Sequence, residues 1–499
     1  MSYLTFFLKQ GLVFIITPAI IGLLGSVGYG VWAVLGSVMN YVGMLNVGIG
    51  SATTRYAAKY HATDDKNSIN RLVSTLLAAV VVIGILTMLV CMGLMPFIPS
   101  ILNIPADLVS AAQITFLVMG FNLVLVLPGG VAARLVYGFQ RLDALKAFMI
   151  VQLVSNAVLT VILLNLGVGL AGLAIAASVS IAINLALNIL FIHRQKYGIH
   201  IQPRFVKLEV IKEIAPYSIR TFVLSLTDRL LYNSANIVIS ISLGITHVTP
   251  YSIAYKLCYI TNYLFTVVVE SVYPRFTKLY TLKDFESLRL LYLKVARLCM
   301  IIVVPIMLTL WICCRPFIYL WVGEENFLGM GAFVLLIIYS IPHAVVGCAF
   351  SLLQAIGKNK GLMLSEIINA VLNVSISIVL VRMVGLLGMA IGTLTASLLS
   401  SFWAIPYLAA KHIQLSFKRY LFSALLPPLL VGLPAALIAW LLVGNFIPNT
   451  HIAFIALKAL LIFGSYIGLY LLFGATKEER RMYLRLLPRV AGINKSQAR

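Results

Sequence analysis

Apolar runs long enough to cross a lipid bilayer follow one another along almost the whole chain, and they leave few ways to fold it. A helix needs about 20 apolar residues to span the bilayer core, where every backbone polar group must be satisfied internally. The chain is 61% hydrophobic and only 10% charged, so it has room for many such spans. The sequence therefore predicts an all-α polytopic membrane protein.

Fourteen membrane helices account for the apolar runs. Pro and Gly interrupt several of them, as in "VLPGGVAAR" and "YSIPHAVVG", and a helix bundle tolerates this because neighbouring helices satisfy the freed backbone groups. No A-x-A-like site follows the first run, so it is expected to be helix 1 and not a cleaved signal. The predicted spans are 3–24, 29–49, 72–97, 108–134, 144–165, 169–192, 214–241, 247–271, 293–321, 329–354, 361–382, 385–408, 421–443 and 452–474.

The basic residues alternate between the loops and orient the chain. Of the 37 Lys and Arg residues, 31 fall on one side, together with both chain ends, whereas the opposite loops carry Asp107, Glu324 and Glu325. The positive side is expected to be cytoplasmic, which places both termini inside. The formal net charge of +22 then reflects topology and attraction to anionic membrane lipids, and no nucleic-acid partner is expected.

The chain also repeats itself at a distance of 213–220 residues. The tetrapeptide "NAVL" at 156–159 returns at 369–372, and "VGL" at 168–170 returns at 384–386. Helices 1–6 and 7–12 are therefore predicted to be two copies of one unit. Six spans is an even number, so both copies enter the membrane from the same side, as in the parallel repeats of alternating-access transporters. An old duplication in a protein that is not a transporter is the alternative.

The repeat divides the chain into two lobes, a joint and an extra helix pair. After Pro203 the joint places Phe205, Leu208 and Ile211 on one face, which predicts a short helix in the inner membrane interface. A capping box, Thr476-x-x-Glu479, opens the tail. The predicted parts are an N-lobe at 1–193, an amphipathic cytoplasmic linker at 194–213, a C-lobe at 214–410, helices 13 and 14 at 411–474 and a basic cytoplasmic tail at 475–499.

Three stretches resemble a known transporter family: "LLGSVGYGVWAVLGSVMNYVGMLNVGIGSATTRYAAKY", "TPYSIAYKLCYI" and the paired "NAVL…VGLxGxAI". They resemble the oligosaccharide flippases of the polysaccharide transporter family, which includes O-antigen flippases. Its superfamily also holds multidrug extruders and the lipid II flippase. The resemblance covers essentially the whole chain and rests on degenerate motifs. Some relatives have only twelve spans, which leaves the role of helices 13 and 14 open.

The resemblance implies two six-helix lobes and a substrate. A polyprenyl-pyrophosphate-linked glycan would be flipped from the cytoplasmic to the outer leaflet of the bacterial inner membrane, for cell-surface polysaccharide biosynthesis. The other expected partners are membrane lipids and a coupling ion, either a proton or sodium. No cofactor and no metal site are expected.

Polar residues inside the predicted spans mark the candidate site, because such residues usually face a cavity or a partner. Arg and Lys can replace the water around a pyrophosphate, whereas Tyr and Asn suit sugar hydroxyls and ring faces. The second lobe carries three polar stripes, and the first lobe offers less, with Arg134, Gln152 and Asn156. The predicted substrate-binding residues are Arg220, Asp228 and Arg229 on helix 7, Tyr255, Lys256, Tyr259 and Asn262 on helix 8, and Glu366 and Asn369 on helix 11.

These residues also allow structural and functional alternatives. Asn156 and Asn369 could form interhelical hydrogen bonds, and Asp228 could form a structural salt bridge with Lys256. A multidrug or cation antiporter of the same superfamily would favour a more acidic interior. An integral-membrane enzyme of polysaccharide assembly is disfavoured, because the chain has no HExxH, GxSxG or Walker motif and its six cysteines lack metal-ligand spacing. No enzymatic activity is therefore expected.

Overall fold

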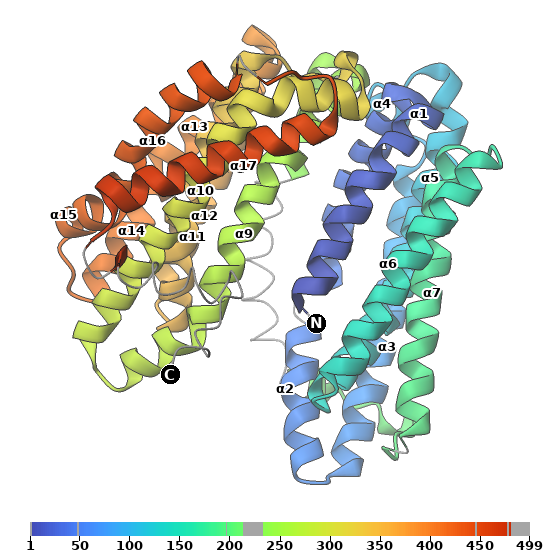
Figure 1. Ribbon diagram of the computed structural model, residues 1–499. Helices are drawn as coiled ribbons and strands as arrows, with labels where there is room; N and C mark the ends of the chain where they lie inside the picture. The colour runs from blue at the N-terminus through green and yellow to red at the C-terminus, as the bar shows by residue number, and fades with distance from the viewer. Residues whose placement is uncertain are drawn as a thin grey trace, which may run out of the picture. The chain divides into compact units, whose positions relative to one another are not determined.

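The computed structural model describes residues 2–46, 49–195, 197–212, 233–444, 447–476 and 479–480. Over these residues the chain forms helices and connecting turns, with no strand. Two compact units are formed, one by Met1–Ser252 with Val381–Gly385 and the other by Ile253–Leu380 with Leu386–Arg499. Each unit is described by itself (Figure 1).

Long helices make up both units. The first part of the chain contains α1 (Ser2–Val42), α2 (Ile49–Ala62), α3 (Lys66–Leu94), α4 (Ile98–Ile101), α5 (Val109–Gly138), α6 (Leu142–Asn165) and α7 (Leu170–Arg194). The later part contains α9 (Val248–Thr281), α10 (Phe285–Val322), α11 (Met330–Ala355), α12 (Asn359–Val384), α13 (Leu386–Leu399), α14 (Ser401–His412), α15 (Phe417–Tyr420), α16 (Leu426–Ile438) and α17 (Ile452–Leu469).

Twelve helices among the described residues are long and apolar enough to cross a membrane. Two observations relate this number to the fourteen predicted spans. Helix α1 contains Gly25 at φ 74° and ψ 168°, so two helices meet there and α1 includes both the first span and most of the second. The seventh predicted span, 214–241, lies mostly outside the described residues, and its end belongs to an apolar helix, Asn233–Leu243.

Some predicted boundaries were wrong. The segment after the second span was predicted to be a loop, but it forms α2, and α3 begins at Lys66, before the predicted start at residue 72. The helix predicted after Pro203 is a 3₁₀ turn over Pro203–Phe205, followed by helical residues at 208–212. Hydropathy identifies the part of a helix that lies within the membrane, whereas capping residues determine where the helix begins. The predicted and observed helix boundaries therefore differ.

The sequence repeat is also a repeat of backbone conformation. Gly25 and Gly244, which align in the two copies, have φ and ψ values of 74° and 168° against 94° and 164°. Gly169 and Gly385 likewise have φ values of 67° and 62°, and each directly precedes a helix. Positive φ combined with ψ of about 165° is adopted almost only by glycine, so Gly25 and Gly244 specify the same turn in both copies.

The start of the third helix is repeated in the same way. Asp65 and Asp284 are both N-caps, accepting hydrogen bonds from the amides of Ser68 at 2.9 Å and Ser287 at 3.0 Å. A hydrogen bond with the side chain of Ser68 or Ser287, and then the bond from its amide, lowers the pKa of each carboxyl below its ordinary value. A capping carboxylate satisfies one of the free amides of a first helical turn, so the same local interaction starts α3 and α10.

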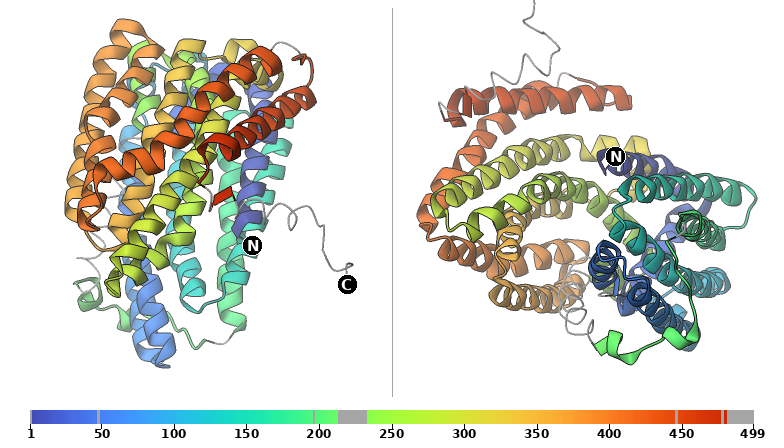
Figure 2. Two further views of the ribbon diagram at one scale, coloured as in Figure 1. Left: turned by 60° about the vertical axis from the view of Figure 1, so that its left-hand side comes forward. Right: turned by 90° about the horizontal axis from the view of Figure 1, so that it is seen from below.

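Helix α5 lies at the centre of the first unit, in contact with α2, α3 and α7. Its core includes Leu72 and Val73 of α3 with Leu127, Val131 and Leu135 of α5. The segment after α7 runs along the edge of this unit in the view from below (Figure 2). This segment is bonded to α3, because the amides of His200, Gln202 and Lys207 donate to Asn70, Ser74 and Thr75 at 2.8, 3.3 and 3.0 Å.

Helix α10 organises the second unit. It packs against α11, α16 and α17, while α11 packs against α13 and α14. Ile301 and Val304 of α10 meet Val431, Ala435 and Tyr466 in one buried cluster. The helices predicted as an extra pair are therefore packed on the body of this unit.

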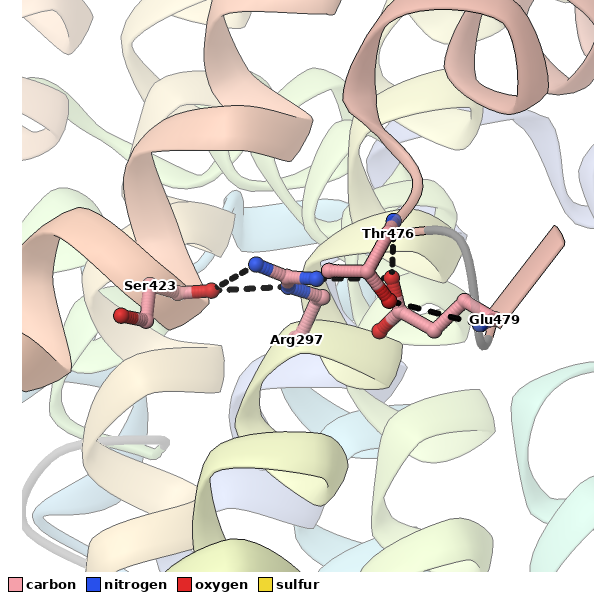
Figure 3. A network of polar contacts seen from close by, with 4 residues as sticks. All are labelled: Arg297, Ser423, Thr476 and Glu479. Atoms are coloured by element: carbon pink, nitrogen blue, oxygen red, sulfur yellow. Dashed lines mark hydrogen bonds and ion pairs between the residues drawn. The ribbon is translucent and has the colours of Figure 1, made fainter.

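The predicted capping box at the tail is confirmed (Figure 3). The Thr476 amide donates to Glu479 Oε2 at 2.9 Å, and the Glu479 amide donates to Thr476 Oγ1 at 3.3 Å. The Glu479 carboxylate also accepts from Arg297 of α10, which donates from its other nitrogens to the Ser423 carbonyl. Glu479 thus completes the capping box and also joins the tail to the helix bundle.

Candidate functional site

Three of the predicted substrate-binding residues, Arg220, Asp228 and Arg229, lie outside the described residues. The other six fall on two helices of the second unit, α9 and α12. They are Tyr255, Lys256, Tyr259, Asn262, Glu366 and Asn369.

The predicted residues of α9 share one helix face in part. The rings of Tyr255 and Tyr259, one helical turn apart, have centroids 6.2 Å from each other. Tyr259 is 42% exposed, and Lys256 is half-buried beside this pair. The two tyrosine rings therefore lie close together on this helix, and their role in substrate binding stays a prediction.

The polar face of α12 is buried. A row of polar residues recurs at every helical turn, at positions 365, 369, 373 and 377. Glu366 lies next to the first of them. The members of this row are Ser365, Glu366, Asn369, Asn373 and Ser377, all at most 6% exposed.

Several oxygen atoms of this row have no hydrogen-bond partner among the described residues. The side-chain oxygens of Ser365, Asn369, Asn373 and Ser377 accept no hydrogen bond within the described part of the chain. Buried polar atoms are usually satisfied, and a bare acceptor costs about 1–3 kcal/mol. Among the described residues, Asn369 Oδ1 thus accepts no interhelical hydrogen bond, and the binding role of Asn369 stays a prediction.

A cavity in the first unit brings together polar groups from three helices. It has a volume of about 370 Å³ and lies between α5, α6 and α7; we call it the α6 cavity. Volumes of about 300–1,000 Å³ are typical of ligand pockets. Its lining residues are Val126, Gly129, Gly130, Ala133, Arg134, Tyr137, Leu145, Met149, Gln152, Ile181 and Asn184.

The segment "PGGVAAR" creates the space for this cavity. Gly129, Gly130 and Ala133 line it with almost no side chain, and Arg134 follows on the same side of α5, four residues after Gly130. A Cβ atom at Gly130 would meet no other atom within 4 Å. The small residues therefore leave a groove that ends at a cation.

Polar groups of the α6 cavity are available to a ligand. Arg134 is exposed, and no hydrogen bond or ion pair engages its side chain within the ranges that the structure describes. Asn184 accepts a 3.0 Å hydrogen bond from Asn188 through Oδ1. The guanidinium of Arg134, the amides of Gln152 and Asn184, and the phenol of Tyr137 thus surround a partly apolar groove.

The polar pattern of the sequence points to the second lobe and does not mark these residues as the site. Arg134 and Gln152 appear in it as polar positions of the first lobe, whereas Tyr137 and Asn184 do not. The Gly-Gly pair one turn before Arg134 was the available signal, since adjacent small residues before a charge leave space for a ligand. Hydropathy and charge alone do not reveal that α5, α6 and α7 converge there.

Among the described residues, no group of three or more His, Cys, Asp and Glu side chains could hold a metal ion. The six cysteines are buried as free thiols.

Comparison with known proteins identifies a family and a fold. The model of a family described as "Polysaccharide biosynthesis protein" matches residues 2–280, more than half of the 499 residues. A search of the curated proteins gives no match.

Several solved structures have the same fold. The lipid II flippase MurJ, in an inward closed conformation, matches 94% of this chain and 98% of its own, with a TM-score of 0.72 and 11% identity. An inward-facing multidrug resistance MATE family transporter of the MOP superfamily matches 82% of this chain and 94% of its own, with a TM-score of 0.71 and 17% identity.

A MOP superfamily transporter from Pyrococcus furiosus, for which a reverse polarity of the binding pocket is described, matches 82% of this chain and 96% of its own, with a TM-score of 0.54 and 17% identity. At these identities the likeness concerns the fold alone. The predicted fold class, an all-α polytopic protein with repeated lobes, is confirmed.

Proposed function

Because the chain belongs to the polysaccharide biosynthesis protein family, we propose that it is a flippase for a polyprenyl-pyrophosphate-linked oligosaccharide. It moves this glycan from the cytoplasmic to the outer leaflet of the bacterial inner membrane, for a cell-surface polysaccharide such as O-antigen. The observation that carries the proposal is Arg134, a cation without a protein partner among the described residues, in a cavity between membrane-spanning helices.

The chemistry of the α6 cavity suits the head group of this substrate. An isolated charge in an apolar medium costs tens of kcal/mol by idealised solvation estimates, so a pyrophosphate needs donors along its path. Arg134 supplies a charge-assisted and potentially bidentate contact. Gln152, Asn184 and Tyr137 offer the neutral donors and acceptors that sugar hydroxyls require. The lipid tail can remain in the bilayer.

In this proposal the substrate moves by alternating access between two lobes. The N-lobe at 1–193 and the C-lobe at 214–410 would move about the linker at 194–213, with both termini in the cytoplasm. Arg220, Arg229 and Lys256 of the second lobe would bind the pyrophosphate on its way outward, and Asp228 would orient one of them. Tyr255, Tyr259, Asn262, Glu366 and Asn369 would contact the glycan. A proton or a sodium ion would couple the step to an electrochemical gradient.

A multidrug or cation antiporter is the second candidate, since a MATE family transporter shares the fold. An organic cation requires an acidic or aromatic cavity. The described lining of the α6 cavity contains one arginine and no carboxylate, so it favours an anionic ligand.

The lipid that co-purifies with the protein tests the proposal. We expect mass spectrometry of the purified chain to show a polyprenyl-pyrophosphate oligosaccharide, and deletion of the gene to remove the corresponding surface glycan. Arg134→Ala should reduce both signals by at least tenfold, and Arg141→Ala, a basic residue outside the cavity, should reduce neither. Export of organic cations without any change in surface glycan would instead favour the antiporter.

A further inference from the structure

A second cavity lies on the other side of α5. It occupies about 430 Å³ between α3, α5 and α7, and residues 197–201 of the segment after α7 cover it; we call it the linker cavity. Pro128, Val131 and Ala132 line it, whereas the neighbouring Gly129, Gly130 and Ala133 line the α6 cavity. One short stretch of α5 therefore separates two cavities of different chemistry.

The lining of the linker cavity is mostly aliphatic. Val73, Leu77, Val131, Leu135, Leu185, Ile189 and Ile192 contribute to it. An apolar cavity of this size holds water poorly, and its walls lose dispersion contacts when nothing fills it. In a bilayer the available filler is a hydrocarbon chain. Ile189 and Ile201, which line the cavity, are 54% and 62% exposed, so a chain can reach it from the surface of the unit.

Two basic residues lie near one end of this cavity, which His193 and residues 197–200 line. Lys66, the first residue of α3, has its side chain beside Gly198, and Arg194 follows His193 at the end of α7. A Cβ atom at Gly198, which lines the cavity, would lie 3.3 Å from Lys66 Cδ, so the lysine stem packs against the cover. The rings of His193 and His200 add possible donors. The charge at this end is complementary to an anionic head group.

We propose that the linker cavity binds one acyl chain of an anionic phospholipid, whose phosphate lies against Lys66 and Arg194. The phospholipid belongs to the basic side of the membrane, the predicted cytoplasmic leaflet. This lipid is not the transported substrate, and the site is separated from the α6 cavity by α5 itself. Because residues 197–201 form its cover, the bound lipid also holds this segment against α3, in addition to the hydrogen bonds of His200, Gln202 and Lys207.

Native mass spectrometry of the delipidated full chain tests the site. We expect one dioleoyl phosphatidylglycerol to remain bound at concentrations where dioleoyl phosphatidylcholine does not. Ala132→Phe, which fills the cavity from α5, should lower the bound fraction at least tenfold. Ala147→Phe is the matched control, because Ala147 is exposed on α6 and does not line the cavity. If Ala132→Phe does not fold, Ala132→Leu fills less of the cavity and should also lower the bound fraction of phosphatidylglycerol.

Two further comparisons separate the acyl chain from the head group. Dihexanoyl phosphatidylglycerol should bind at least tenfold more weakly than the dioleoyl lipid, and Lys66→Gln with Arg194→Gln should remove the preference over phosphatidylcholine. In hydrogen exchange, phosphatidylglycerol should slow the amides of residues 198–207 in the unsubstituted chain and not in Ala132→Phe. If folded Ala132→Phe binds phosphatidylglycerol as well as the unsubstituted chain does, the proposal is overturned. Displacement of phosphatidylglycerol by an equimolar polyprenyl phosphate would assign the cavity to the substrate tail and would also overturn it.

Discussion

Arg297 and Glu479 are 182 residues apart in the chain, yet Nη1 of the arginine lies 2.7 Å from Oε2 of the glutamate. Their side chains are only 11% and 14% exposed. Arg297 Nε also donates to the Ser423 carbonyl at 2.7 Å, within the π-helical segment Leu421–Leu425. In this irregular helical segment the Ser423 carbonyl is available to accept from Arg297. The Arg297 guanidinium therefore joins three parts of the unit: α10, the start of the thirteenth predicted span and the tail.

Removal of Arg297 should destabilise the protein more than removal of the glutamate charge. Arg297→Ala leaves a carboxylate and a carbonyl with fewer partners in a mostly buried place, which should cost about 2–4 kcal/mol. Glu479→Gln keeps the capping geometry and should cost less. Thermal unfolding in detergent measures both. Arg141→Ala is the control, since its pair with Asp143 is 40% and 62% exposed and should contribute little. Equal melting temperatures for Arg297→Ala and Arg141→Ala would contradict this account.

Gly130→Leu should block transport without damaging the fold. A Cβ atom there meets nothing within 4 Å, so the larger side chain occupies the α6 cavity rather than a neighbouring helix. Replacing a helical glycine should leave stability unchanged or slightly raised. Surface glycan should fall at least tenfold at normal protein abundance. Gly93→Leu, at an exposed helical glycine that also meets nothing within 4 Å, should leave export intact. Full export by the Gly130 variant would exclude this cavity from the substrate path.

Asn369→Leu separates a functional from a structural role of the α12 row. Its buried Oδ1 has no hydrogen-bond partner among the described residues, so an apolar replacement should be nearly neutral for stability. Export should nevertheless fall if the amide contacts the glycan. Asn122→Leu is the contrasting variant, because Asn122 Nδ2 donates to the Ala174 carbonyl at 3.0 Å and its loss should cost about 1–3 kcal/mol. A strong loss of stability with Asn369→Leu would instead identify a structural residue.

Lys256→Ala should abolish export while protein abundance stays near normal. Lys256→Arg should retain part of the activity, because the charge matters more than the shape of the group at this position. The structural alternative is a salt bridge with Asp228, and it predicts that Asp228→Asn with Lys256→Gln restores what each single change removes. Surface polysaccharide in the unsubstituted strain, the Asp228→Asn and Lys256→Gln strains and the double variant distinguishes the two, and recovery in the double variant would remove Lys256 from the substrate path.

The predicted orientation can be measured by thiol labelling of intact cells. In a background without the six buried cysteines, Ala62→Cys, near Asp65, should resist an impermeant reagent, whereas Glu325→Cys should react. Ala62 ends α2 and Glu325 lies in the 3₁₀ helix Glu324–Asn326; both are exposed, so their labelling should report the side of the membrane. The opposite labelling pattern would reverse the proposed direction of transport.

Much of the fold could be predicted because its determinants are local. The cost of an exposed backbone in hydrocarbon forces each apolar run into a helix. The positive-φ turns at Gly25 and Gly244 and the capping box at Thr476 depend on residues close together in the chain. The boundaries of α2 and α3 could not be predicted with the same accuracy, because hydropathy does not register polar helical turns.

The helical membrane class, the charge asymmetry and the twofold repeat can be read from the amino-acid sequence, since each depends on short-range spacing or on composition. Other features appear only once the helices are packed: "PGGVAAR" separates a polar cavity from an apolar one, the segment after α7 bonds to Asn70, Ser74 and Thr75, and Glu479 pairs with Arg297. These contacts join groups up to 182 residues apart. Their formation depends on how whole helices pack, and no local pattern encodes which side chains then meet.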